Sequence, residues 1–169
     1  IRKEGNTPAW GAVFEQHFQE IDKVKGQKGE LSVEKKLFVE TNNGTNRQIR
    51  PVTPEQPLRI GDKVIVRLTI RTDREMNYVF LKDLRAGCFE PADQLSGPES
   101  RDGIWYYRSP KDVSENFFIN RLPEGTFVLE YPVYVSRSGE YAGGISTIQC
   151  MYAPEFVSHT AGESLRIMP

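Results

Sequence analysis

Histidine and cysteine are both scarce in this sequence of 169 residues, which contains two of each. His17 and His159 lie in opposite terminal regions, and Cys88 and Cys150 are also far apart. A structural zinc site needs about four ligands that come in short local pairs, and no such spacing is present. With so few histidines, neither is expected to be a catalytic base. We therefore predict no metal, no other cofactor and no enzymatic activity for this chain.

A charge excess is also missing. The formal net charge is -1, and basic and acidic residues are interleaved throughout. Proteins that bind nucleic acid or an anionic membrane normally carry a basic excess or stripe, so no nucleic-acid partner is expected. No apolar run approaches the roughly 18 residues that span a bilayer, so no direct membrane insertion is expected. No leader opens the chain, and we interpret the sequence as a fragment whose parent determines its location.

Motifs of nucleophilic and phosphate chemistry are absent as well. The sequence has no Gly-x-Ser-x-Gly elbow and no glycine loop of the phosphate-binding type. Residues 88–91, Cys-Phe-Glu-Pro, are one residue away from the Cys-x-Glu-Gln sequence that forms an internal thioester. Pro91 cannot supply the glutamine carbonyl, so no thioester is expected here.

The two cysteines leave two interpretations open. Cys88 and Cys150 both lie in strand-like segments, where a buried thiol acts as a small hydrophobic group. The alternative is a single disulfide between Cys88 and Cys150, formed in an oxidising compartment.

What is abundant is period-two alternation of apolar and polar residues, which is typical of half-buried β-strands. The clearest strands are predicted over residues 63–72 and 126–135. Others are predicted over residues 9–18, 31–41, 78–86, 104–107, 116–122, 145–152 and 165–168. Clusters of glycine, proline and asparagine separate them. The pattern predicts an all-β chain folded as an antiparallel β-sandwich.

Helix is expected to play little part. Residues 15–24 could form an amphipathic helix, but the preceding Trp-Gly-Ala-Val-Phe run is β-like and favours a strand that frays into a loop. Residues 109–115 begin Ser-Pro, which is compatible with one short helical turn.

Two groups of residues are candidate sites. Acidic pairs such as Asp83 with Glu90 could imitate a glycosidase dyad, but solvated edge and turn residues are the favoured interpretation. Trp105 and Tyr107 share one side of a predicted strand, with Tyr106 on the other, and are the candidate platform for a stacked ligand such as a sugar. Core packing of this cluster is the favoured alternative.

Several short motifs, in order along the chain, resemble the C-terminal macroglobulin-like domain of bacterial α2-macroglobulins. The matching stretches are residues 58–64 with a Gly-Asp-x-Val core, 83–91, 122–131 beginning Leu-Pro-x-Gly, 149–154 containing Met-Tyr-x-Pro, and 159–167. Gly143-Gly144 stands where the family often has two prolines, and residues 94–109 resemble an insertion. With these departures, the sequence resembles a divergent, Bacteroides-type branch of the family.

The resemblance implies a macroglobulin/Ig-like sandwich over residues 29–169. It also implies that residues 1–28 are the last strand and linker of a preceding CUB-like domain. The parent would be an exported protease trap, periplasmic or on the cell surface and held by a lipid anchor. This domain would contain neither bait nor thioester. Its expected partners are the thioester-type helical domain and the CUB-like domain of the same parent, and target proteases through that parent. A carbohydrate- or surface-binding β-sandwich is the alternative function.

Overall fold

Strands account for most of the chain in the computed structural model, which describes residues 4–8, 10–43 and 46–169. The single 3-10 turn assigned in these residues is η1 (Ile21–Lys23). The strands are β1 (Leu31–Asn43), β2 (Asn46–Pro51), β3 (Leu58–Arg59), β4 (Lys63–Thr72), β5 (Met76–Leu84), β6 (Phe89–Pro91), β7 (Gly97–Arg101), β8 (Ile104–Pro110), β9 (Ser114–Leu122), β10 (Gly125–Val135), β11 (Gly139–Ala142), β12 (Ser146–Cys150), β13 (Ala153–His159) and β14 (Ser164–Met168).

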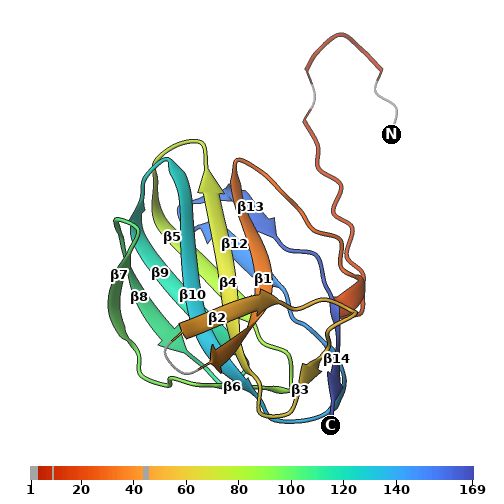
Figure 1. Ribbon diagram of the computed structural model, residues 1–169. Coiled ribbons are helices and arrows are strands. Elements are labelled where there is room, and N and C mark those ends of the chain that lie inside the picture. Colours follow the sequence, from red (N-terminus) through yellow and green to blue (C-terminus); the bar gives the residue numbers. More distant parts are fainter. Residues whose placement is uncertain (1–3, 9, 44–45) are drawn as a thin grey trace.

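Two antiparallel sheets form the body of the molecule (Figure 1). One has the order β2-β1-β4-β10-β6 and the other β13-β12-β5-β9-β8-β7. A third, small sheet, β11-β14-β3, contains a parallel pair between β14 and β3. The antiparallel sandwich predicted from the alternation is confirmed.

The core lies between the two large sheets and comes from the alternation that the sequence displays. Along β10 every second residue from Phe127 to Val135 is buried, and β4 presents Val64, Val66, Leu68 and Ile70 in the same way. The Phe117 ring of β9 lies 6.1 Å from the Tyr131 ring of β10, so large side chains meet across the sandwich. Burying such side chains contributes roughly 1.5–3 kcal/mol each to folding.

An ion-pair cluster joins the tip of the β7–β8 hairpin to β10. Glu130 accepts hydrogen bonds from Arg67 Nε at 2.6 Å and from Arg101 Nη2 at 2.7 Å. Burial opposes ionisation of Glu130, but the two guanidinium groups outweigh it and hold the pKa of Glu130 below its usual value. The ionised carboxylate therefore helps to fasten the hairpin to the five-stranded sheet.

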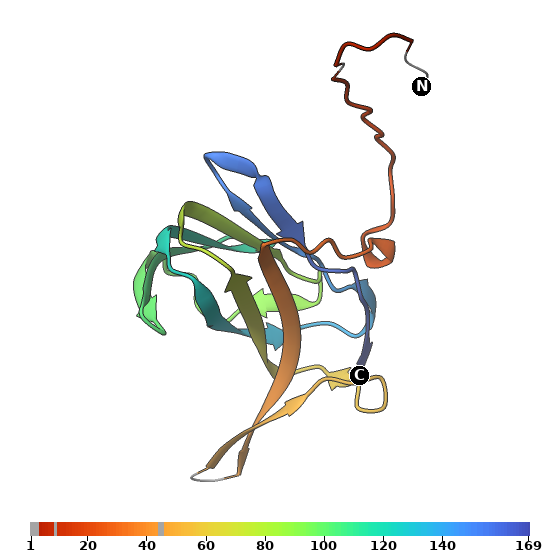
Figure 2. The ribbon, with the colours of Figure 1, turned by 90° about the horizontal axis from the view of Figure 1, so that it is seen from above.

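The N-terminal segment differs from the prediction. Residues 10–20 form no strand or helix and extend away from the sandwich (Figures 1 and 2), with Trp10, Phe14 and Phe18 more than nine-tenths exposed. The strand predicted over residues 9–18 is therefore wrong for the described part, 10–18, because its backbone finds no neighbouring strand; residue 9 lies outside the described residues. Contact with the sandwich begins close to η1, where the Gly162 amide donates to the Val24 carbonyl at 2.8 Å.

Other differences concern turns and short strands. The helical turn considered over residues 109–115 is wrong, because β8 runs to Pro110, β9 begins at Ser114, and the Lys111 amide donates to the Ser114 carbonyl at 2.8 Å. Strands that the sequence did not predict are β2, β3, β6, β7, β11 and β13. Most of these are short or lie at a sheet edge, where pairing rather than composition sets the conformation.

Candidate functional site

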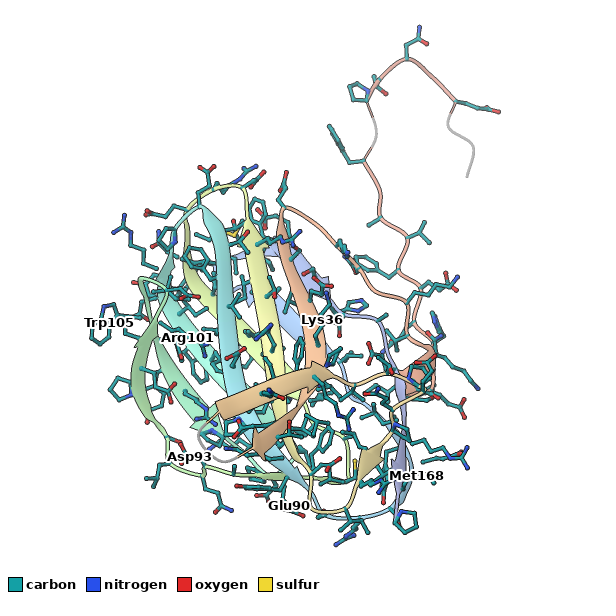
Figure 3. All side chains as sticks on the ribbon, in the orientation of Figure 1. Lys36, Glu90, Asp93, Arg101, Trp105 and Met168 are labelled. Atoms are coloured by element: carbon teal, nitrogen blue, oxygen red, sulfur yellow. The ribbon has the colours of Figure 1, made fainter. Side chains whose placement is uncertain are left out.

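The outer face of the six-stranded sheet carries a row of aromatic side chains. Trp105 and Tyr107 of β8 point outward and are 71% and 47% exposed, while Tyr106 points inward and is buried. The predicted division of the three residues between two faces is confirmed. Core packing holds for Tyr106, whose hydroxyl donates to Glu99 Oε2 at 3.0 Å, and is wrong for Trp105 and Tyr107. Figure 3 shows Trp105 directed away from the body.

Residues paired on the neighbouring strands extend this row of aromatic side chains across the sheet. Tyr107 lies opposite Phe118 of β9, which in turn lies opposite Phe80 of β5. The Phe80 and Phe118 rings are stacked, with centroids 4.9 Å apart and an interplanar angle of 24°. Cross-strand aromatic pairs of this kind stabilise a sheet by roughly 0.2–1 kcal/mol, yet Phe118 remains 46% exposed.

The turn between β12 and β13 adds a second aromatic pair to the same face. Tyr152 is 81% exposed and packs edge-on against Tyr78, with ring centroids 5.1 Å apart. The Met151 amide donates to the Tyr78 carbonyl at 2.9 Å. Tyr78 has φ of 56°, a left-handed conformation that costs a residue with a side chain about 1–2 kcal/mol. Such strain is typical of positions held for a binding role.

These two groups are contiguous, and we call them together the aromatic face: Tyr78, Phe80, Trp105, Tyr107, Phe118, Met151 and Tyr152. A shallow cavity of about 230 Å³ joins its two halves and is lined by Tyr78, Phe80, Phe118, Met151 and Tyr152 together with neighbouring residues. Monomeric proteins rarely expose large contiguous apolar patches, and those that do usually bind a partner there. The aromatic face can bury apolar area but offers no acid, base or nucleophile.

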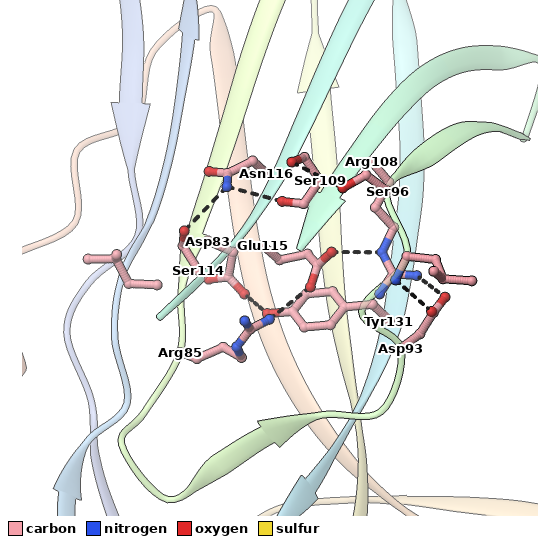
Figure 4. A network of polar contacts seen from close by, with 12 residues as sticks. Asp83, Arg85, Asp93, Ser96, Arg108, Ser109, Ser114, Glu115, Asn116 and Tyr131 are labelled. Atoms are coloured by element: carbon pink, nitrogen blue, oxygen red, sulfur yellow. Dashed lines mark hydrogen bonds and ion pairs between the residues drawn. The ribbon is translucent and has the colours of Figure 1, made fainter. Parts of the chain in front are cut away.

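Inside the sandwich lies a charge network that the sequence analysis did not predict (Figure 4). Asp83 is fully buried and accepts hydrogen bonds from Lys35 Nζ and Ser146 Oγ, each at 2.8 Å, and from the Tyr131 hydroxyl. Its interpretation as a solvated edge residue is therefore wrong. Burial and the Asp83 carboxylate raise the pKa of Tyr131 well above its usual value, so the phenol stays a donor.

Glu115 forms the second half of this network. Its Oε2 accepts from Arg85 Nη1 and its Oε1 from Arg108 Nε, both at 2.8 Å. Burial raises the pKa of Glu115, and the two guanidinium groups act in the opposite direction. The bonds of Asp83 on β5 to Lys35 on β1 and to Tyr131 on β10 join the two large sheets, whereas Glu115 on β9 links Arg85 and Arg108 along one of them.

Cys88 and Cys150 are both buried and free in the structure. Cys150 lies opposite Val79 on β5, whereas Cys88 follows the far end of that strand at Leu84. The five residue steps from Val79 to Leu84 span about 17 Å, and the Cα atoms of a disulfide lie only about 4–7 Å apart. Two separate thiols are therefore our prediction, with the disulfide as the alternative that a mass measurement tests. Burial raises the pKa of Cys88 to about 11, which makes it a poor nucleophile at neutral pH.

Side chains of the metal-ligating types form no candidate site in the part of the chain that the structure describes. Over residues 4–8, 10–43 and 46–169, no three His, Cys, Asp or Glu side chains gather in an arrangement suited to a metal ion. His17 is exposed, and His159 Nδ1 lies 3.1 Å from the Thr160 carbonyl oxygen. Within the same ranges, the structure contains no helix with the length and apolar character needed to cross a membrane.

Comparison with known proteins decides the family. Residues 31–155 match the family model of the bacterial alpha-2-macroglobulin MG10 domain. The chain belongs to this family. The resemblance in the sequence is thereby confirmed, and the matched residues run from the start of β1 into β13.

Solved macroglobulin structures share this domain's fold. Salmonella alpha-2-macroglobulin reacted with methylamine superposes with a TM-score of 0.67 at 21% identity, covering 86% of this chain and 10% of that one. Native Escherichia coli alpha-2-macroglobulin, from domain MG7 to the C-terminus, gives a TM-score of 0.65 at 16% identity, covering 85% of this chain and 24% of that one. Circularly permutated Ras protein 2 of Dictyostelium discoideum is 28% identical over 109 residues, which are 64% of this chain and 3% of that protein. The chain thus spans only a small part of the relatives it matches.

Proposed function

We propose that this chain is a non-catalytic terminal domain of an exported α2-macroglobulin-like endopeptidase inhibitor, and that it packs against and stabilises the rest of the trap. The observation that carries the proposal is the aromatic face on a domain of this family. Trp105 and Tyr152 are 71% and 81% exposed, although the interior of the same sheet is well packed. An apolar surface of this kind favours a stable contact with another domain.

Membership of the family supports the partners that we propose. We assign residues 29–169 to the macroglobulin-like sandwich and residues 1–28 to the end of a preceding CUB-like domain, where they would serve as its last strand and linker. That domain would supply the neighbouring strand that residues 10–18 lack here, and would cover Trp10, Phe14 and Phe18. The aromatic face would contact the thioester-type helical domain. Target proteases would bind the parent protein and would not be bound by this domain directly. We expect the parent in the periplasm or on the cell surface, held by a lipid anchor.

The physical role of such a domain is to hold the uncleaved trap in one conformation. Truncating a central aromatic residue in a protein interface typically costs about 2 kcal/mol or more of binding free energy. A loss of that size shifts an equilibrium between packed and released domains about 30-fold. Trp105 and Tyr152 are exposed in this domain by itself, so their truncation is expected to act on the contact and not on the fold.

The test uses the intact parent with Trp105→Ala and Tyr152→Ala combined. Leu95→Ala is the matched control, because Leu95 is 80% exposed and lies outside the aromatic face. We expect the double variant to convert to the fast-migrating collapsed form on native gels before any protease is added. The control should convert only after cleavage. An aromatic-face variant that stays uncollapsed and traps protease like the unsubstituted parent would refute the proposed contact.

A carbohydrate-binding role has one observation in its favour, the neighbouring exposed rings of Trp105 and Tyr107 on β8. Flat aromatic side chains can stack against sugar rings. A glycan array followed by titration of the isolated chain separates the two functions. A packing domain should give no saturable signal. Saturable binding that Trp105→Ala abolishes would favour the carbohydrate-binding module instead.

A further inference from the structure

The guanidinium group of Arg85 is buried with one of its edges unpaired. Its side chain is only 1% exposed, and Nη1 donates to Glu115 Oε2 at 2.8 Å. Nε and Nη2 have no hydrogen-bond partner among the described residues. These two nitrogens share one edge of the planar group, so their N–H bonds form a fork that points at a single acceptor position.

The neighbouring carboxylates do not fill this position, because their hydrogen bonds go to other donors. The second oxygen of Glu115 accepts from Arg108 Nε at 2.8 Å, so two guanidinium groups share one buried carboxylate. Both oxygens of Asp83 are taken up by Lys35 and Tyr131, with Ser146 as a further donor.

Arg108 has additional acceptors that Arg85 lacks. Asp93 and Glu99 reach Arg108 Nη1 from the surface at 3.3 and 3.5 Å, and their side chains are 46% and 40% exposed. Among the described residues, Arg85 has no such surface carboxylate, and its ion pair is with Glu115. The positive charge of Arg85 is therefore the least neutralised in the network, at a place almost without solvent.

A buried cation with unpaired donors is unfavourable, and two kinds of small occupant would relieve it. A water molecule could accept the two hydrogen bonds but would leave the charge in place. A small monovalent anion accepts the hydrogen bonds and also balances the charge that Glu115 divides between two arginines. The Arg85 side chain is only 1% exposed, which favours a small anion over a phosphate ester or a peptide carboxylate.

We propose that the Nε–Nη2 edge of Arg85 is a binding site for a small halide-type anion, with chloride as the occupant in ordinary saline solution. The anion would lie beside β5, where the Arg85 amide also donates to the Val113 carbonyl in the β8–β9 turn at 2.9 Å. Bound there, it would complete the charge network between the sheets. The folded domain should then be stabilised by halide at constant ionic strength.

Crystals of the unsubstituted chain soaked in sodium bromide provide the direct test. We expect an anomalous difference peak that bridges Nε and Nη2 of Arg85. Electron density at this edge without an anomalous signal would identify water and overturn the proposal. So would a guanidinium whose edge is paired with a protein oxygen.

Thermal and urea unfolding supply the second test, with sodium chloride replaced stepwise by sodium gluconate. Above the dissociation constant, each tenfold rise in chloride should lower the unfolding equilibrium constant about tenfold. Equal stability in the two salts would contradict a halide site.

Variants assign the effect to one residue. Arg85→Lys keeps the charge but loses the fork, and should abolish the difference between chloride and gluconate. Arg121→Lys is the control, since Arg121 is 70% exposed and pairs with Glu75 at the surface, and its chloride response should be unchanged. Chloride dependence that survives in Arg85→Lys would place the anion elsewhere. If Arg85→Lys does not fold, the bromide experiment on the unsubstituted chain decides.

Discussion

Replacing Asp83 by asparagine is the sharpest test of how the sandwich is held together. The carboxylate is fully buried and accepts from Lys35, Ser146 and the Tyr131 hydroxyl, whereas the Lys35 side chain is only 10% exposed. The amide of asparagine has nearly the same shape, but it leaves the Lys35 ammonium without its counter-charge.

The magnitude follows from the cost of a broken buried ion pair, about 3–5 kcal/mol. Lys35 keeps hydrogen bonds to the Leu84 and Gly143 carbonyls at 2.9 and 3.2 Å, which favours the lower end of that range. For a domain of this size, each kcal/mol shifts Tm by about 2–4 °C. We therefore expect Asp83→Asn to lower Tm by about 10 °C.

Circular dichroism during heating and urea titration measures this shift. Asp73→Asn is the control, because Asp73 pairs with Arg74 at the surface and its Tm should not change measurably. Joint replacement of Lys35 by methionine and Asp83 by leucine should recover part of the loss, since no buried charge then remains unpaired. A Tm for Asp83→Asn within about 3 °C of the unsubstituted chain would refute the reasoning.

Three further predictions concern a turn, a thiol pair and an ion-pair cluster. Gly144→Ala should destabilise the chain in urea much more than Gly103→Ala, although both glycines have positive φ. A Cβ at Gly144 would lie 2.1 Å from the Leu84 carbonyl oxygen at the end of β5, whereas a Cβ at Gly103 would have no atom within 4 Å. Equal losses of stability in the two variants would show that backbone strain, and not the clash with Leu84, determines the effect. Cys88 and Cys150 should resist iodoacetamide until the chain is unfolded, and reduction should leave the mass of the intact chain unchanged; a gain of two hydrogens on reduction would mean a disulfide. The depressed pKa of Glu130 means that its ionised form stabilises the fold above its unfolded pKa, near 4.5, and that this contribution is lost as the pH falls through the lower folded pKa. Glu130→Gln should therefore lower stability at pH 7 and flatten the decline on acidification, and an unchanged pH profile would argue against the pairing.

The local alternation of apolar and polar residues was sufficient to predict the long strands and the outward facing of Trp105 and Tyr107 in the aromatic face. The predicted strand over residues 63–72 coincides with β4, and the predicted facing of Trp105 and Tyr107 agrees with their exposure. The sequence also contained an unused signal. Asp83 has the same parity as the buried Val79 and Leu81, so alternation alone placed this charge on the inner face.

The sequence by itself determined the all-β class and the inner and outer faces of the long strands, because side-chain alternation is a local property. Only the tertiary structure decided which outward side chains stay uncovered, since neighbouring strands bring together Phe80, Phe118 and Tyr107 from separate parts of the chain. It also decided that Glu115 serves two arginines and that residues 10–18 lack a strand partner. Pairing partners, and therefore burial of charge, depend on contacts between residues distant in sequence, which no local pattern specifies.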